Sequence, residues 1–402
     1  MKKSFLSVIV ISALFTAGLF AQSEDFEDMS TESFEEMDDF DSIFSDAEDL
    51  EEAVTDEPAQ GNGVVQVFSS AFSSMVHFSG SFSGSLGVTY NYDGRIENED
   101  DRDSYAFGIK LNNSLNMTIN PGAALVIRGG LDTGIDNGFN LGVSYLYFDY
   151  LLFDRIYISA GKRGVSWGYL RLFTDGHNNI FSEDGTQLAM EIRYPWTFGT
   201  LTFAVTGNAS NVKPNSLNYY GSLEVTVLNT SINLFAKRPE KLSEPKKSNA
   251  FGLELKRTIL GFDVYGQELL RLSNIRAFDS PKNYDYIIET VGFYRLFDSF
   301  DPNIGFNIEY KHEYEPKAEK EHSDYISFEG GLKRLGKNKN IKIGVTSKFN
   351  ITEKNGSSTL GLAVSGLLPY ADWANSFGIS YGKGYNAAVF SISTGLSLSL
   401  DY

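Results

Sequence analysis

Carboxylates and basic groups spaced two residues apart are the side chains in this sequence that could do chemistry. Three pairs show the spacing: Glu191/Arg193, Glu254/Lys256 and Glu309/Lys311. Successive side chains of an extended strand point to opposite faces, so residues two apart share a face. Opposite charges on one face can pair with each other, or they can orient a polar solute that passes between them. Neither role requires a cofactor, and we expect none.

Further charged residues fall in the same alternating segments. They are Lys110, Arg128, Arg163, Asp263, Arg271, Glu329 and Lys333. A Lys or Arg that faces lipid in the middle of a bilayer would cost about 2–4 kcal/mol. Because this cost would apply to each basic residue, the charged side chains cannot all face lipid. In a membrane barrel they must line a water-filled lumen. The lumen could be an open pore with a transverse field, or an internal salt-bridge network that fills and stiffens the barrel.

The longest connection, Gly164–Gly185, follows Arg163 directly and contains Arg171. A loop of this length can fold into a barrel and narrow its pore, which would make Arg163 and Arg171 constriction residues. The simpler interpretation is an ordinary surface loop. The sequence leaves both interpretations open.

Enzyme chemistry has little support. The four histidines are His77, His177, His312 and His322, and cysteine is absent. None of the four forms the H-E-x-x-H zinc motif. His312 and His322 flank residues 313–321 and could bind a metal, although exposed, solvated positions are the simpler expectation. We therefore predict no enzyme, no catalytic or cofactor-binding residue and no metal site.

The elements that must position these side chains are strands. From Val76 onward the sequence alternates with a period of two, with Phe78, Phe82 and Leu86 on one face and serines on the other. Such alternation is typical of a strand with one apolar and one polar face. Several of these segments run for roughly ten to fifteen residues, whereas strands of soluble sandwiches usually have five or six and membrane-spanning strands need about 9–11.

Long and short connections alternate along the chain. Asp93–Asp103 is long and charged, Asn120–Gly122 is tight, and Gly164–Gly185 is long again. Outer-membrane barrels place long loops outside and short turns in the periplasm. We predict an all-β, closed antiparallel transmembrane β-barrel of about 18 strands, because an open sheet edge cannot satisfy its backbone in lipid. Weak separation near Ala363–Tyr385 leaves 16 strands as the alternative.

The formal net charge of −18 is concentrated near the N-terminus. Residues 24–57 hold 17 of the 52 acidic residues and no Lys or Arg. The remainder of the chain is close to neutral and has no basic face for nucleic acid, so we expect no nucleic-acid partner. We interpret residues 22–63 as a disordered, acidic low-complexity periplasmic tail, with a partner-binding segment or a lumen plug as alternatives.

The first residues have the features of a secretory signal. Lys2 and Lys3 precede the apolar run Phe5–Phe20, and cleavage after Ala21 is plausible. We therefore divide the chain into a signal peptide (1–21), the acidic tail (22–63) and the barrel (64–402). The expected location is the cell outer membrane.

Two segments resemble known membrane barrels. Gly395–Tyr402 alternates apolar residues and ends in an aromatic residue, and Ile158–Gly168 contains Gly161-Lys162-Arg163 followed by Trp167-Gly168. The first is similar to the insertion signal of outer-membrane barrels, although Tyr402 stands where Phe is usual. The second resembles a strand of several porin-like families. The acidic tail after a short leader is similar in style to spirochaete outer-membrane proteins.

This resemblance to a Gram-negative-type outer-membrane porin-like family covers roughly residues 76–402. It implies a porin-like channel but no particular substrate. From the charged lumen we predict passive diffusion of small polar solutes, and we expect outer-membrane lipid and the barrel assembly machinery, acting on the C-terminal strand, as partners. The alternatives are a structural or adhesive barrel and a plugged transporter of lipids or hydrophobic solutes. The polar Ser, Asn, Lys and Glu faces argue against an apolar lumen.

Overall fold

The computed structural model describes residues 76–122, 124–135, 139–165, 168–173, 187–207, 214–238, 249–272, 285–316, 318, 320–368, 370–385 and 387–401. The predicted signal peptide and acidic tail lie outside these residues. None of the helices in the described part of the chain is long and apolar enough to cross a membrane.

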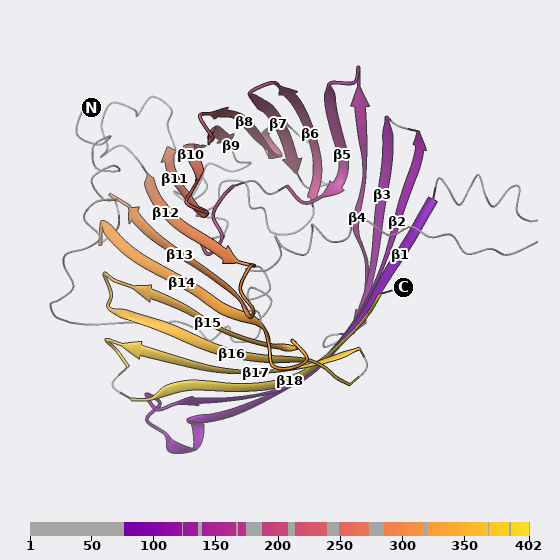
Figure 1. The fold of residues 1–402 in the computed structure, drawn as a ribbon. Coiled ribbons are helices and arrows are strands. Elements are labelled where there is room, and N and C mark those ends of the chain that lie inside the picture. The colour runs from indigo at the N-terminus through magenta and orange to yellow at the C-terminus, as the bar shows by residue number, and fades with distance from the viewer. Residues whose placement is uncertain are drawn as a thin grey trace, which may run out of the picture.

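Within the described residues, 18 strands form a single sheet (Figure 1). The strands are β1 (Val76–Asp93), β2 (Asp103–Gly122), β3 (Leu125–Ile135), β4 (Phe139–Leu152), β5 (Ile156–Arg163), β6 (Gln187–Trp196), β7 (Gly199–Gly207), β8 (Leu217–Val227), β9 (Thr230–Arg238), β10 (Asn249–Ile259), β11 (Phe262–Leu272), β12 (Tyr286–Phe297), β13 (Asn303–Tyr314), β14 (His322–Leu335), β15 (Ile341–Asn350), β16 (Asn355–Leu368), β17 (Ala371–Gly382) and β18 (Val389–Asp401). Short 3₁₀ turns occupy Glu99–Asp101 and Pro214–Ser216.

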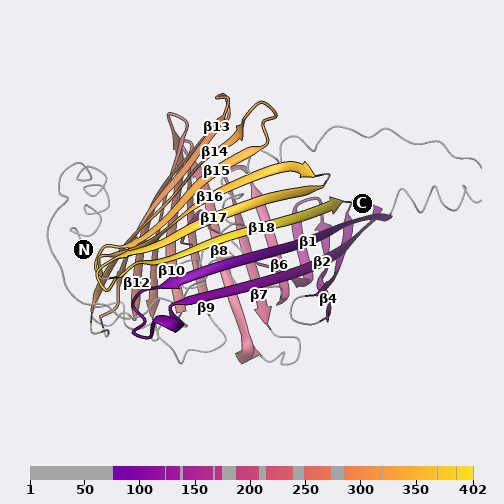
Figure 2. The same ribbon diagram turned by 90° about the horizontal axis from the view of Figure 1, so that it is seen from below.

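Each strand pairs antiparallel with the strands before and after it, and the last strand pairs with the first. Val88 of β1 lies opposite Phe107 of β2 on one side and Thr394 of β18 on the other. The sheet therefore closes on itself and leaves no edge. Figure 2 shows the tilted strands of one side lying next to one another, with β18, β1 and β2 as neighbours. The prediction of a closed antiparallel barrel is confirmed.

The strand number is 18 because the weakly separated segment near the C-terminus contains two strands. β16 and β17 are joined by a tight turn in which Tyr370 has a φ of 62°. The alternative of 16 strands is therefore wrong. Tight turns of this kind lie at one end of the barrel, as at Leu228–Asn229, where both residues have positive φ and match the twist of the flanking strands. Longer connections, such as 164–186 and 273–285, join the strands at the other end.

The outer face of the barrel is apolar. Phe107, Phe139 and Leu201 point outward, and each leaves at least half of its surface exposed. Similar exposed apolar side chains occur on most of the strands, and such a continuous surface is not compatible with water. Alternation of apolar outward and polar inward residues is the pattern of transmembrane barrels.

Candidate functional site

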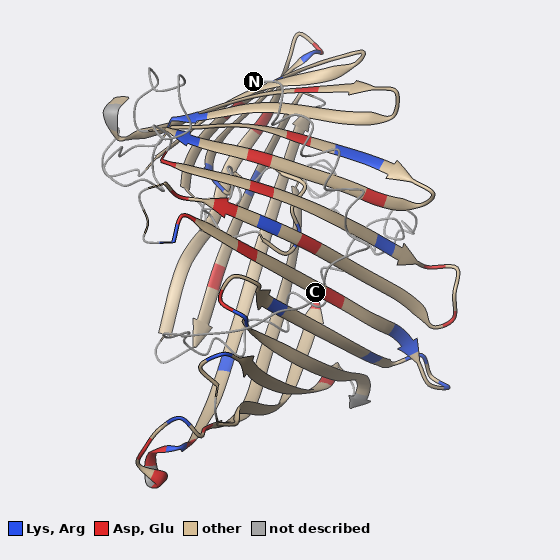
Figure 3. Cartoon of the chain, turned by 90° about the vertical axis from the view of Figure 1, so that its left-hand side faces the viewer, with Lys and Arg blue, Asp and Glu red and all other residues tan. Residues whose placement is uncertain are grey.

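A row of buried polar side chains crosses the inner face of the barrel. Glu254, Gln267, Thr290 and Lys311 lie opposite one another on β10, β11, β12 and β13, and all four are buried. Leu255, one residue further along β10, points outward and is exposed. Figure 3 shows acidic and basic bands on neighbouring strands. Because side chains alternate between the two faces, these four polar side chains point into the barrel interior.

The first group of charges lies on β3, β4 and β5. The Arg128 guanidinium forms an ion pair with Asp149 and lies 3.5 Å from the Tyr147 hydroxyl. The Ser159 hydroxyl donates to the same carboxylate. The Arg163 guanidinium lies over the Tyr147 ring, 5.2 Å from its centroid, a distance at which a cation is attracted to the ring face.

Gly161 allows β5 to lie close to β4 at this point. Its φ is +139°, and a Cβ atom there would collide with the Leu146 carbonyl and with Tyr147. Only glycine adopts this conformation without strain. The Gly161-Lys162-Arg163 sequence therefore brings Arg163 next to Tyr147.

The second group of charges centres on Glu191 of β6. This carboxylate is buried and forms ion pairs with Arg193, on the same strand, and with Arg163 at 3.8 Å. Two guanidinium groups and one carboxylate leave this part of the inner face with a positive balance.

Both groups line a cavity of about 770 Å³ in the barrel interior. Glu224 and Glu254 also line this cavity, together with Tyr169 and Thr202. Basic and acidic side chains thus face the same space from neighbouring strands.

A segment of the β5–β6 connection, residues 168–173, lies inside the ring of strands (Figure 1). Glu309 of β13 accepts hydrogen bonds from the backbone N–H groups of Arg171 (2.6 Å), Leu172 (3.0 Å) and Phe173 (2.8 Å). The Tyr265 hydroxyl donates a fourth at 2.7 Å. Glu309 is fully buried, and hydrogen bonds to an ionised acceptor are about twice as strong as neutral ones. This carboxylate anchors the segment to the barrel wall.

Tyr169 makes a second attachment. Its backbone N–H donates to Glu254 at 3.3 Å, and its hydroxyl donates to Glu224 at 3.0 Å. Asn233 also donates to Glu254, at 2.9 Å. Burial, reinforced by the Glu224 charge, raises the pKa of the Tyr169 phenol, so the hydroxyl stays protonated and remains a donor.

Aromatic and basic side chains complete the packing of the segment. The Arg171 guanidinium lies over the Tyr294 ring, 3.7 Å from its centroid, and the Lys311 ammonium lies 4.7 Å from the centroid of Phe173. Leu170 packs with Tyr265 and Tyr294 in a small buried cluster. The segment is therefore held by hydrogen bonds, cation–π contacts and apolar packing together.

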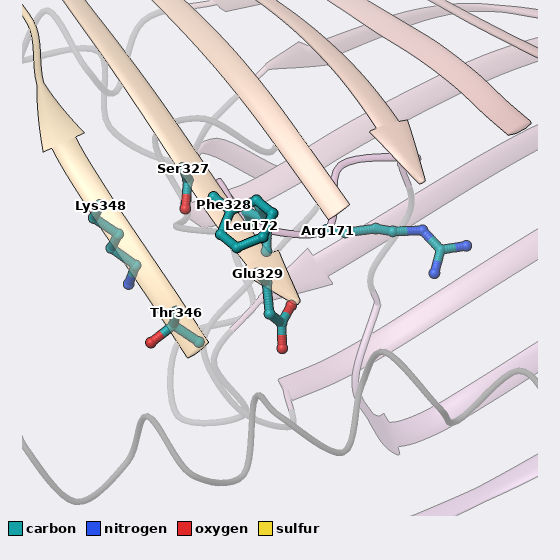
Figure 4. Close-up of a pocket in the computed structure, with 7 residues that line it drawn as sticks. All are labelled: Arg171, Leu172, Ser327, Phe328, Glu329, Thr346 and Lys348. Atoms are coloured by element: carbon teal, nitrogen blue, oxygen red, sulfur yellow. The ribbon is translucent and has the colours of Figure 1, made fainter. Parts of the chain in front are cut away.

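A smaller cavity of about 30 Å³ lies beside Arg171 and Leu172 of the segment. Figure 4 shows Ser327 and Glu329 on one of its strands and Thr346 and Lys348 on the next, while the Arg171 side chain extends away from them. Glu329 is buried. The structure thus brings Glu329 close to the segment without placing it beside the Arg171 guanidinium.

The remaining predicted residues occupy other levels of the inner face. Lys256 forms an ion pair with Asp263 at 3.3 Å, and Arg271 is buried near the end of β11. Lys110 lies opposite Ser85, and Lys333 lies opposite Asn303. The structure therefore groups Arg128, Arg163, Glu191, Arg193 and Glu254 around one cavity and leaves these others outside it.

The sequence interpretation missed Asp149, Glu224 and four tyrosines. The tyrosines are Tyr147, Tyr169, Tyr265 and Tyr294. On the strands, the same period would have found them: Tyr147 lies two residues before Asp149, and Tyr265 lies two after Asp263. Among the described residues, no cluster of three or more His, Cys, Asp or Glu groups is arranged to hold a metal.

The inner face of β16–β18, β1 and β2 differs from the rest. Apart from Lys110, it carries mainly serine, threonine, asparagine and glycine, and its hydroxyls bond to one another across strands. The Thr89 and Ser393 hydroxyls lie 3.1 Å apart, and those of Ser81 and Ser114 lie 2.7 Å apart. We call this inner face the hydroxyl wall, and the inner face of β3–β15 the charged wall.

Solved structures with the same architecture include Pseudomonas aeruginosa OccK8 (OprE) and OccK11 (OpdR). The first is 8% identical with a TM-score of 0.52, and the match covers 81% of this chain and 98% of the other. The second is 9% identical with a TM-score of 0.54, covering 81% and 96%. A variant of the Rh. blastica porin is 11% identical with a TM-score of 0.45, covering 81% and 100%.

Neither the protein-family models nor the curated protein sequences contain a match to this chain. At identities this low, the structural likeness establishes the fold and not the substrate. The predicted porin-like resemblance is confirmed at this level: the chain has the closed antiparallel barrel of OccK8 and OccK11.

Proposed function

We propose that this protein is an outer-membrane channel for passive diffusion of small polar solutes through a charged, water-filled lumen. The observation that carries the proposal is the convergence of charged side chains on a cavity of about 770 Å³ inside a closed barrel. The segment 168–173, bound to Glu309, narrows the space beside it. A barrel of about this many strands encloses an aqueous channel unless it is plugged.

The proposed path has an uneven distribution of charge around the cavity. On β3–β6, Arg128, Arg163 and Arg193 outnumber Asp149 and Glu191, whereas Glu224 and Glu254 line the cavity from β8 and β10. A polar solute that enters this space meets a field directed across the barrel, which favours one orientation of its dipole. An apolar solute would displace water from these charged side chains without replacing the lost hydrogen bonds, which costs free energy.

A purely structural barrel is the second candidate, and one observation favours it. Arg128 is already paired with Asp149, and Arg193 with Glu191. Such pairs could stiffen the wall rather than serve a solute. A plugged transporter for lipids or hydrophobic solutes has less support because charged and polar side chains line the larger cavity. We propose no catalytic activity.

The route to the membrane belongs to the same proposal. Residues 1–21 would direct export and be removed. The C-terminal strand, β18, would be recognised by the barrel assembly machinery, and the apolar outer face would contact outer-membrane lipid. The acidic tail, residues 22–63, would remain in the periplasm, bind a partner there or enter the lumen.

The test is conductance in planar lipid bilayers, with the mature chain and with a variant that lacks residues 22–63. We expect stepwise channels in both. If the tail enters the lumen, its deletion will raise the single-channel conductance, and if it remains free the two proteins will conduct alike. Failure of both proteins to conduct, while each shows the heat-dependent gel mobility of a folded barrel, would contradict the channel and leave the structural barrel.

A further inference from the structure

The outer face of the β13–β14 hairpin carries two histidines near the end with the longer connections. Glu309, Lys311 and Glu313 alternate inward along β13, so His312 and Tyr314 point outward. On β14, Asp324 lies opposite His312 and His322 lies opposite Tyr314. The four side chains therefore share one patch at the end of the hairpin.

The two imidazole rings are close and ordered by their neighbours. Nε2 of His312 lies 3.3 Å from Nδ1 of His322, and the rings stack with their centroids 5.3 Å apart. The ring of Tyr314 stacks on the other side of His322, with a centroid distance of 4.8 Å.

A carboxylate fixes the orientation of the first histidine. Nδ1 of His312 lies 2.8 Å from Oδ1 of Asp324, so this nitrogen carries the proton and donates it to the carboxylate. Nε2 of His312 is then left with its lone pair. Tyr310 donates its hydroxyl to the same oxygen at 2.5 Å, and the Asp324 backbone N–H donates to Thr352 at 2.8 Å. Asp324 is therefore held by two further groups.

The separation of the two ring nitrogens matches that of two ligands on one transition metal. Metal–nitrogen distances of about 2.0–2.1 Å in a tetrahedral site place two imidazole nitrogens about 3.3–3.4 Å apart. A carboxylate that accepts the second N–H of a histidine is the usual outer partner of a metal-bound imidazole. The hairpin provides both features.

The surrounding charge favours a cation. Glu289 of β12 lies opposite His312 on the same outward face, and Glu268 of β11 lies opposite Glu289. His322 is exposed, so water can reach the remaining coordination positions.

We propose that His312 and His322 form a binding site for a divalent transition metal such as Zn²⁺, Ni²⁺ or Cu²⁺ on the outer rim of the barrel. Nε2 of His312 and Nδ1 of His322 are the two ligands, water completes the coordination, and Asp324 orients His312. When metal replaces the hydrogen bond between the rings, the proton on Nδ1 of His322 moves to its Nε2. The site joins β13 to β14 and does not depend on transport.

Calorimetric titration of the folded, tag-free full chain in detergent with NiCl₂ and with ZnCl₂ tests the proposal. We expect one histidine-dependent site, lost in both His312→Gln and His322→Gln. Asp324→Asn should weaken binding by about 10–100-fold, the usual effect of removing an outer partner. His77→Gln, a histidine on β1, is the matched control and should bind as the original chain does.

Binding that is unchanged in either His312→Gln or His322→Gln would overturn the proposal. Electron paramagnetic resonance of the unmodified chain with one equivalent of Cu²⁺ provides a measurement that needs no variant. Two coordinated imidazole nitrogens are the expected signature, and a signal from oxygen ligands alone would overturn the proposal equally.

Discussion

The charged wall and the hydroxyl wall solve the same problem, a polar interior in an apolar environment, with different chemistry. The strands β10–β14 carry fifteen charged residues on their two faces. The five strands of the hydroxyl wall contain only Asp93, Asp103, Lys110, Asp372 and Asp401. Small neutral groups can satisfy each other or water at little cost, whereas buried charges need fixed partners.

This difference explains where the segment 168–173 lies. Glu309 and Glu254, both on the charged wall, accept its backbone N–H groups. Serine and threonine hydroxyls are weaker acceptors and already bond to one another in the hydroxyl wall. The charged wall thus holds the segment, whereas hydroxyls of the hydroxyl wall bond to one another instead.

The largest expected effect comes from Glu309→Ala. It leaves the N–H groups of Arg171, Leu172 and Phe173 without their acceptor, and each buried donor left unsatisfied costs about 1–3 kcal/mol. The segment should leave the wall, and the single-channel conductance should rise. Ser393→Ala, on the opposite wall, is the control. Equal conductance of the two variants would break the distinction between the walls.

The second-largest effect is expected on the charge selectivity of the channel. Arg128→Gln removes a positive charge from the cavity and should shift ion preference toward cations, whereas Asp149→Asn should shift it toward anions. The two residues form one ion pair, so the double variant should return close to the original preference. Reversal potentials across a salt gradient measure this. Shifts in the same direction for both single variants would contradict the model of a charged path.

A smaller effect is expected from Tyr294→Leu. The aromatic face that attracts Arg171 is lost, at a cost of about 0.5–2 kcal/mol. Current noise should increase because the segment moves more, with little change in mean conductance. Tyr294→Phe keeps the ring and should behave like the original protein. Noise that rises equally in both variants would instead assign the effect to the hydroxyl.

The smallest effect is expected in the hydroxyl wall. Thr89→Val removes one hydroxyl of the buried pair with Ser393 and should lower stability by about 1 kcal/mol. Conductance and selectivity should stay unchanged, because no charge and no anchor is involved. Urea unfolding in detergent measures the loss of stability. A selectivity change as large as that of Arg128→Gln would show that the hydroxyl wall also guides ions.

Much of the fold could be predicted from the alternating pattern. Burial on one face and lipid on the other force a period of two, so the strands and the inward position of Glu254 and Lys256 could be predicted. Closure of the sheet follows from the same pattern, because every backbone polar group that lies in lipid must be paired.

The partners of the charges could not be predicted, because they depend on register. Register is set by turns and by irregularities such as the shift between Gly130 and Leu131 in the β3–β4 pairing. The ion pair of Arg128 with Asp149 and the orientation of His312 by Asp324 both join different strands. Spacing along one strand carries no information about either.

The junction between β1 and β18 has a consequence for biogenesis. Thr89 and Ser393, whose hydroxyls meet there, are separated by 304 residues of chain. Until the last strand has been delivered, the growing sheet has two unpaired edges that can recruit other chains. Pairing two strands this far apart in the chain costs loop-closure entropy, so this pairing should form late and slowly. β18 must therefore be in place before the sheet can close, and a chain truncated before β18 would keep two unpaired edges that favour aggregation, rather than form a smaller barrel.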